Sequence, residues 1–114
     1  MITLKVAFKR GILIREKTLF FDFTIGALEY AVKNILKIEF KELGSYKGEY
    51  DLNVALLYGA YYYACMSRFK KPKYGFHHAV MWYEYLSKES REQMTLALVE
   101  LMGEIGVKKK AKAK

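Results

Sequence analysis

The sequence predicts an α+β fold, in which a small N-terminal antiparallel β-sheet packs on about four α-helices. Residues 2 to 9 alternate apolar and polar side chains, the period of a half-buried strand, and Arg10-Gly11 supplies a turn after them. From residue 25 onward, apolar side chains recur at helical spacing in successive segments. A length of 114 residues suits one domain, which we place at residues 1–106, followed by a disordered, Lys-rich tail at residues 107–114.

Extended chain is expected to continue as far as Phe23. β-branched and aromatic residues dominate Ile12 to Ile14 and Thr18 to Phe23. Between these segments, Arg15-Glu16-Lys17 is either a charged turn or an exposed stretch of one long strand. In both cases the resulting hairpin has few strands and needs a helix packed on one face.

The first helix is expected to begin after Thr24, whose hydroxyl can cap it. An apolar stripe at helical spacing follows, made of Ile25, Leu28, Val32, Ile35 and Leu36. Leu43-Gly44 resembles a helix C-terminus, so we expect the helix to reach about Leu43, with or without a break. The residues from Ser45 to Tyr50 then form a polar loop.

A second helix is expected from Asp51, which can cap it, to about Phe69. The sixteen residues from Leu52 to Ser67 carry no formal charge. A helix that is apolar nearly all round must be buried on most sides. Only a strip of small or polar residues is expected to meet water; its members are Asn53, Ala60, Ala64 and Ser67.

Two amphipathic helices are expected after Pro72, which stops the second helix. The apolar stripe of the first is formed by Phe76, Ala79, Val80, Tyr83 and Leu86. Ser87 caps the last helix, and Gly106 ends it. The apolar face of that helix consists of Met94, Ala97, Leu98, Leu101, Met102 and Ile105.

Charge and composition favour a soluble protein of the cytoplasm. Of the net charge of +8, five charges belong to lysines after residue 107, which leaves 15 basic against 12 acidic side chains in the body. The single cysteine, Cys65, cannot form an internal disulfide and fits a reducing compartment. The N-terminus lacks the apolar segment of a signal peptide, and the longest uncharged run is too short for a membrane span of about 20 residues.

No pattern of residues predicts a catalytic, cofactor or metal site. His77 and His78, with Cys65 and Glu84, suggest a metal site, but adjacent residues on a helix point about 100° apart. The two histidines therefore cannot share a face as an i,i+4 pair of ligands would. The sequence contains no CxxC pair, no HxxxH pair and no glycine-rich phosphate loop. We therefore expect a protein that is not an enzyme and holds no cofactor.

A basic surface is the basis of one functional hypothesis, a small nucleic-acid-binding protein. Arg68, Lys70, Lys71 and Lys73 interleave with aromatic residues after the central helix, and the tail adds lysines. The tail residues concerned are Lys108, Lys109 and Lys110. Against this hypothesis, cations are favoured at a helix C-terminus without any ligand, and no known nucleic-acid-binding motif is present.

Three segments give the chain a family resemblance. Phe21 to Glu29 reads FDFTIGALE and turns strand into helix, and a later apolar helix opens with Asp51-Leu52 and carries LLYGA from Leu56 to Ala60. Tyr85-Leu86-Ser87 then leads into the last amphipathic helix. Together these segments resemble the tail assembly chaperones of long-tailed bacteriophages and prophages, over roughly Leu4 to Ile105.

The resemblance implies a function based on binding rather than catalysis. Such chaperones coat and solubilise the tape-measure protein, help to recruit tail-tube subunits, tend to self-associate, and leave before the virion is complete. A Tyr- and Met-rich surface would accept apolar client helices, as in helix-in-groove recognition. The residues we expect on that surface are Tyr58, Tyr61, Tyr62, Trp82 and Tyr85, although each could instead belong to the core, as we favour for Trp82. We expect the protein to act in the host cytoplasm, with no membrane partner.

Overall fold

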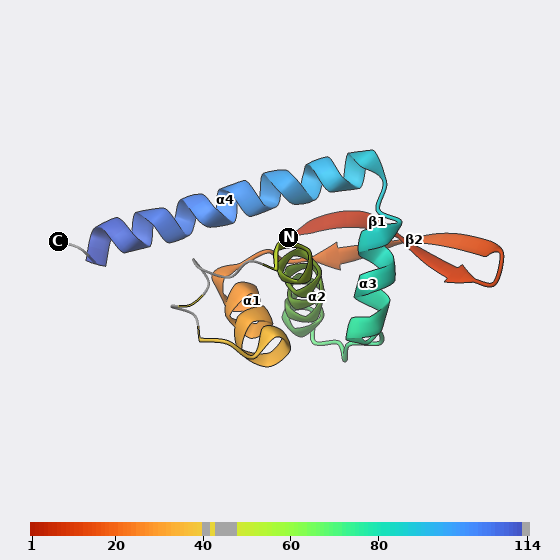
Figure 1. The fold of residues 1–114 in the computed structure, drawn as a ribbon, viewed down its shortest axis with the longest axis horizontal. Helices are drawn as coiled ribbons and strands as arrows, with labels where there is room; N and C mark the ends of the chain where they lie inside the picture. Colours follow the sequence, from red (N-terminus) through yellow and green to blue (C-terminus); the bar gives the residue numbers. More distant parts are fainter. Residues whose placement is uncertain (40–41, 43–47, 113–114) are drawn as a thin grey trace.

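One helix, α2 (Glu49–Ser67), lies at the centre of the fold, and the other elements surround it (Figure 1). The computed structural model describes residues 1–39, 42 and 48–112, with the backbone alone at residue 49 and beyond residue 103. The other elements are β1 (Ile2–Arg10), β2 (Leu13–Phe21), α1 (Ile25–Tyr30), the π-helix η1 (Ala31–Leu36), α3 (Phe76–Glu84) and α4 (Lys88–Lys112). In Figure 1, α1 and α3 flank α2, α4 runs along the top, and the hairpin reaches out beyond α3. The predicted α+β fold, with its N-terminal antiparallel sheet and its helices, is confirmed.

β1 and β2 form a two-stranded antiparallel sheet and pair along their full lengths. A two-residue turn joins them, and Gly11 takes its first position with a φ of 63°, where a side chain would be strained. β2 runs without interruption, so Arg15-Glu16-Lys17 is the exposed stretch of one long strand and not a turn.

The main core fills the space between one face of the hairpin and the helices α2 and α3. Leu4, Val6 and Phe21 of the hairpin pack with Leu57 of α2 and Trp82 of α3. A second cluster joins α1 and η1 to α2 and α4; its buried members are Leu28, Ala31, Val32, Ala55, Leu56 and Leu101. Among the described helices, none combines the length and the apolar character needed to cross a lipid bilayer.

The first helical segment starts as predicted and ends early. The Oγ1 of Thr24 accepts a hydrogen bond from the main-chain N–H of Ala27 at 3.1 Å, which caps α1. The helix widens into η1 and ends at Leu36, because Lys37 takes a left-handed backbone with a φ of 56°. An unbroken helix to about Leu43 is therefore wrong, and residues 40, 41 and 43–47, where a helix after a break would continue, lie outside the described part.

The central helix differs from its prediction at both ends. Its N-cap is Gly48, so Asp51 lies in the first turn and is not the cap. The Asp51 carboxylate still complements the positive end of the helix dipole there. At the C-terminus, α2 stops at Ser67 and not at Phe69, whose φ of 55° cannot continue a right-handed helix.

The small residues of α2 mark its closest packing, which is the opposite of what we predicted. Ala60 and Ala64, expected to meet water, are fully buried, whereas Ser67 is exposed and Asn53 is half-buried. The main-chain N–H of Asp22 donates a hydrogen bond to the carbonyl oxygen of Ala60 at 2.9 Å. A larger side chain on this strip would prevent such an approach of the chain to the helix backbone.

The last helix begins at its predicted cap and extends beyond its predicted end. The main-chain N–H of Ser90 donates to the Oγ of Ser87 at 3.2 Å, and the buried Ser90 hydroxyl donates to the carbonyl oxygen of Lys5 at 3.4 Å. The prediction that the helix stops at Gly106 is wrong, since its backbone continues to Lys112. Lysine and alanine favour helix, and cations suit a helix C-terminus, which offsets a glycine cost of about 1 kcal/mol. The tail predicted to be disordered is thus helical over most of its length, and its last two residues lie outside the described part.

Candidate functional site

The five aromatic residues predicted to bind a client do not share one surface. Trp82 has 0% of its surface exposed and Tyr61 has 4%, so both belong to the core. Their rings meet edge to face with centroids 5.2 Å apart. Neither side chain can contact a client while the protein remains folded.

Tyr61 has a different role, because its hydroxyl anchors the basic loop that follows α2. The hydroxyl accepts hydrogen bonds from the main-chain N–H groups of Lys73 at 2.9 Å and Tyr74 at 3.2 Å. Burial, and next a hydrogen bond with the side chain of Cys65, raise the pKa of Tyr61 to about 12. The two main-chain donors oppose this shift only in part, since they favour the phenolate.

The raised pKa of Tyr61 predicts that the protein loses stability in alkaline solution. A phenol whose pKa is higher in the folded state than the usual value near 10 binds its proton more tightly when folded. This contribution is complete below about pH 10 and is lost as the pH rises through about 12. Urea unfolding followed by circular dichroism from pH 8 to pH 12 should show the decline. The Tyr61→Phe variant should show a shallower decline, and an equal slope in the two proteins would contradict the assignment to Tyr61.

The other three predicted aromatic residues are at least partly exposed, but they face different neighbours. The hydroxyl of Tyr58 donates to the carbonyl oxygen of Tyr74 at 3.1 Å. Tyr62 stacks on Tyr30 of α1 with centroids 4.3 Å apart. Tyr85, which is exposed, accepts a hydrogen bond from the Nζ of a lysine on β1 at 3.2 Å. The tyrosines of the predicted Tyr- and Met-rich surface are therefore engaged largely in contacts within the chain.

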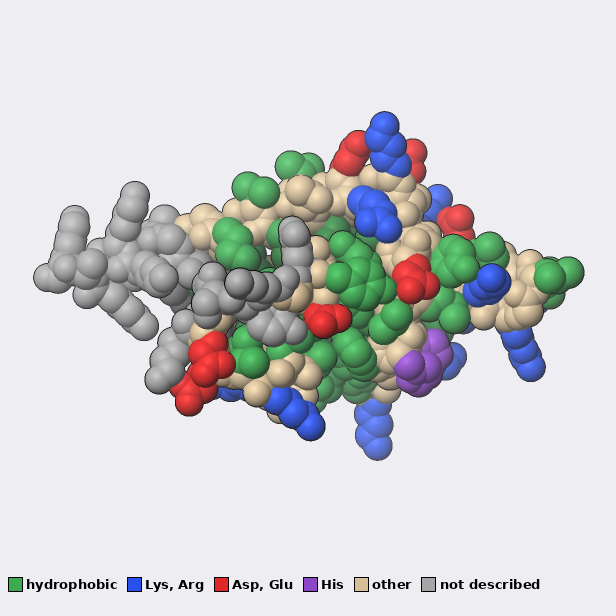
Figure 2. Space-filling view, in the orientation of Figure 1, with side chains coloured by type: hydrophobic (Ala, Val, Ile, Leu, Met, Phe, Trp, Pro, Cys, Tyr) green, Lys and Arg blue, Asp and Glu red, His purple; other side chains and the backbone are tan. Residues whose placement is uncertain are grey.

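A groove beside α4 is a better candidate for binding, and the sequence analysis missed it. It has a volume of about 160 Å³ and is lined by Asn53, Tyr83, Arg91, Met94, Thr95 and Leu98. Its wall is fixed by hydrogen bonds: Asn53 donates to the Tyr83 hydroxyl at 3.1 Å, and the Nη2 of Arg91 donates to the Tyr83 carbonyl oxygen at 2.9 Å. The Arg91 guanidinium also lies 5.1 Å from the centroid of the Tyr83 ring. Figure 2 shows hydrophobic side chains gathered below α4, over the region of α2 and α3.

The outer face of α4 extends this apolar surface. A hollow of about 430 Å³ shares Arg91 and Thr95 with the groove and is further lined by Leu96 and by the charged Lys88 and Glu92. Leu96 is 65% exposed and Val99 is 64% exposed, on the side of the helix opposite the buried Leu101. We call Leu96, Val99 and the exposed Met102 the outer stripe. The sequence signal for it was present, because the run from Met94 to Met102 is apolar on more than one face of a helix.

The predicted basic residues after α2 are exposed, as expected of a solvated loop. Arg68, Lys70, Lys71 and Lys73 all lie on the surface. The guanidinium carbon of Arg68 lies 4.0 Å from the centroid of the Phe20 ring, so the loop returns to β2. The backbone of Lys108, Lys109 and Lys110 is part of α4, and the side chains of these lysines lie outside the described part.

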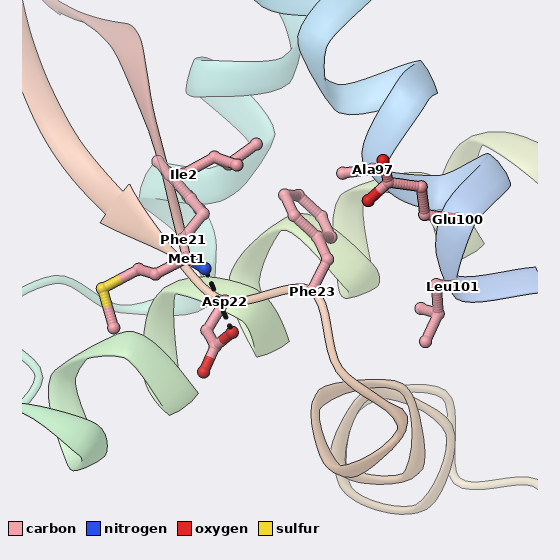
Figure 3. Close-up of a pocket in the computed structure, with 8 residues that line it drawn as sticks. All are labelled: Met1, Ile2, Phe21, Asp22, Phe23, Ala97, Glu100 and Leu101. Atoms are coloured by element: carbon pink, nitrogen blue, oxygen red, sulfur yellow. Dashed lines mark ion pairs between the residues drawn. The ribbon is translucent and has the colours of Figure 1, made fainter. Parts of the chain in front are cut away.

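A small pocket lies between the start of the hairpin and α4 (Figure 3). Its volume is about 90 Å³, and Phe23 points into the space between Ile2 and Ala97. The N-terminal amine of Met1 lies 3.9 Å from the Oδ1 of Asp22. The polar groups at this pocket are that amine and the carboxylates of Asp22 and Glu100, and we assign no ligand to it.

The histidines serve the local fold. Within the described part of the chain, no group of three or more His, Cys, Asp or Glu residues is placed to hold a metal ion. The Nδ1 of His78 accepts a hydrogen bond from the main-chain N–H of Gly75 at 3.2 Å, at the start of α3. Burial, and next the neighbouring His77, lower the pKa of His78. This ring is thus a neutral acceptor at a helix start near neutral pH.

The groove, the outer stripe and the basic loop are the candidate sites that the geometry provides. Comparison with known proteins adds no assignment to them. The chain matches no protein-family model, no curated protein sequence and no solved structure.

Proposed function

We propose that this chain is a non-catalytic tail assembly chaperone of a long-tailed bacteriophage or prophage. It binds and solubilises the tape-measure protein and helps to recruit tail-tube subunits. The order of elements and the segments FDFTIGALE and LLYGA, which resemble that family, support this proposal. In this proposal it acts in the host cytoplasm and is absent from the finished virion.

The observation that carries the proposal is the groove beside α4 together with the outer stripe. A client helix with an apolar face can lie along α4, with its side chains against the outer stripe and the groove residues Thr95 and Leu98. Removing the exposed parts of Leu96 and Val99 from water contributes roughly 1–2 kcal/mol each. The hydrogen bonds of Tyr83 hold the groove in place before binding, which lowers the entropic cost of association.

The same surface accounts for self-association when no client is present. Exposed aliphatic side chains next to a groove favour contact with a second copy as well as with a client. Because both would use the same surface, a client and a second copy of this chain should compete for it. Raising the client concentration should therefore turn oligomers of this chain into complexes.

A double substitution in the outer stripe tests the proposal. Leu96→Glu with Val99→Glu places charge on the surface where the client helix would pack, so binding should fall by at least about tenfold because buried charges are costly. The chain is co-expressed with a tape-measure protein from the same genome, and the soluble fraction and co-purification of that client are measured. The folded state of the variant is checked by circular dichroism.

The hairpin tip offers a matched control. Ile12→Glu with Leu13→Glu removes two aliphatic side chains that are also exposed and introduces the same charge. This control should keep the client soluble. The proposal fails if the wild-type chain neither solubilises nor retains the client, or if the tip variant loses binding while the α4 variant keeps it.

A further inference from the structure

The structure brings together cations that are far apart in the sequence. Besides the contact of Arg68 with Phe20, the Nζ of Lys17 donates to the hydroxyl of Tyr74 at 3.3 Å. The loop after α2 therefore lies along β2. We call the resulting surface the basic corner; it consists of Lys17 and Phe20 of β2 with Arg68, Phe69, Lys70, Lys71 and Lys73 of the loop.

The cations of the basic corner sit on a fixed backbone. The main-chain N–H of Lys70 donates to the carbonyl oxygen of Cys65 at 2.9 Å, and that of Phe69 donates to the carbonyl oxygen of Met66 at 3.1 Å. Tyr61 holds the far end of the loop at Lys73. Because main-chain donors already satisfy these last carbonyls of α2, the lysine side chains are not needed to cap the helix.

Phe69 is the least expected residue of this surface. It occupies the position after the helix end that is left-handed and usually glycine, with a φ of 55°. Its ring is 98% exposed, so no packing within the chain compensates for the strained backbone. A large flat ring between Arg68 and Lys70 is thus held toward solvent, which is where a ligand with planar groups would meet it.

The charge around the ring is of one sign. No aspartate or glutamate occurs between Leu52 and Tyr83, which covers most of α2, the whole loop and α3 up to its last residue, Glu84. On β2, Glu16 shares the strand face of Phe20 but lies four residues from it, roughly 13 Å along the strand. The ligand that matches this surface is therefore an anion with repeated charges and flat apolar groups.

We propose that the basic corner binds single-stranded nucleic acid. The phosphates would lie on Lys17, Lys70, Lys71 and Lys73, and a base would stack on the ring of Phe69. An anionic bilayer is the competing partner, but cations that surround a single aromatic ring suit alternating phosphates and bases better than an apolar layer. This inference does not depend on the chaperone function, which uses α4.

The test measures the fluorescence anisotropy of a labelled oligothymidine of about 15 nucleotides, a length within the range of single-strand sites. All proteins carry glutamine substitutions at the five tail lysines, so that these charges do not contribute: Lys108→Gln, Lys109→Gln, Lys110→Gln, Lys112→Gln and Lys114→Gln. Lys70→Glu with Lys71→Glu should weaken binding by at least about tenfold. Losing two phosphate contacts should also reduce the slope of log affinity against log salt by about 1.4.

Phe69→Gly separates stacking from folding. Glycine relieves the left-handed strain, so the variant should have a higher Tm, while its affinity for the oligonucleotide falls about fivefold or more. The matched charge control is Lys33→Glu with Lys88→Glu, two exposed lysines outside the corner, which should keep the affinity within about twofold.

Several outcomes would overturn this inference. The inference would be wrong if the oligonucleotide did not bind at low salt, or if Phe69→Gly kept full affinity. It would also be wrong if the control pair, Lys33→Glu with Lys88→Glu, weakened binding as much as Lys70→Glu with Lys71→Glu. Binding to vesicles that contain anionic lipid, without binding to the oligonucleotide, would assign the corner to a membrane surface instead.

Discussion

Trp82→Ala is expected to destabilise the protein by about 3–5 kcal/mol, the range for truncating a fully buried tryptophan. The indole lies at the centre of the core, where its ring centroid is 6.0 Å from that of Phe21 and 5.2 Å from that of Tyr61. Alanine would leave a cavity between β2, α2 and α3, and these three elements cannot all move inward to fill it. Because a domain of this length has a total stability of only about 6–17 kcal/mol, the variant should be close to unfolding in mild denaturant.

The measurement is urea unfolding followed by circular dichroism at 222 nm, since the substitution removes the only tryptophan. Tyr85→Ala is the matched control, because it truncates an exposed aromatic residue near the same helix. The control should cost less than about 1 kcal/mol. Similar losses in the two variants would mean that Trp82 is not the centre of the core.

Gly59→Ala is expected to destabilise the protein by about 1–3 kcal/mol, although alanine is the better helix former. A β-carbon at residue 59 would lie 2.7 Å from the carbonyl oxygen of Ala27 and 3.5 Å from the β-carbon of Ala31. The first contact involves backbone, which cannot move aside as a flexible side chain would. To relieve it, α1 must move away from α2, and the packing of the second core cluster must change with it.

Gly103→Ala provides the control of opposite sign. Gly103 also lies within a helix, but nothing lies within 4 Å of the β-carbon it would gain. Alanine there should stabilise the protein by about 0.5–1 kcal/mol through helix propensity alone. Urea midpoints of the two variants should move in opposite directions, and a shift of the same sign would refute the close approach at Gly59.

The features that the sequence predicted correctly are the ones fixed by local chemistry. The hairpin follows from alternation and from Gly11, and the helix starts at Thr24 and Ser87 follow from hydroxyls that cap nearby N–H groups. The central position of α2 follows from its lack of charge, because an apolar helix has to be covered. Each of these conclusions depends on residues that lie close together in the sequence.

The features that could not be predicted from the sequence depend on contacts between distant segments of the chain. Ala60 and Ala64 look like a solvent strip by polarity and size, but small residues also allow close packing, and only the position of Asp22 decides between the two. The same holds for the candidate sites. The sequence identifies the lysines after α2 as a basic surface. That Lys17 lies beside them depends on how the loop returns to β2. The buried role of Tyr61 could not be predicted either, because its hydroxyl binds main-chain groups of the loop and the position of that loop is known only from the fold.

The uninterrupted second strand has a consequence for solubility. Within the described part of the chain, β2 is paired on one side only, and its residues from Leu13 to Thr18 are exposed. An open strand edge invites pairing with another copy. In an antiparallel pair of two such edges centred on Glu16, glutamate would face glutamate, and Arg15 would face Lys17. Like charges directly opposite each other are unfavourable, so the charged triplet disfavours this pairing of two hairpin edges.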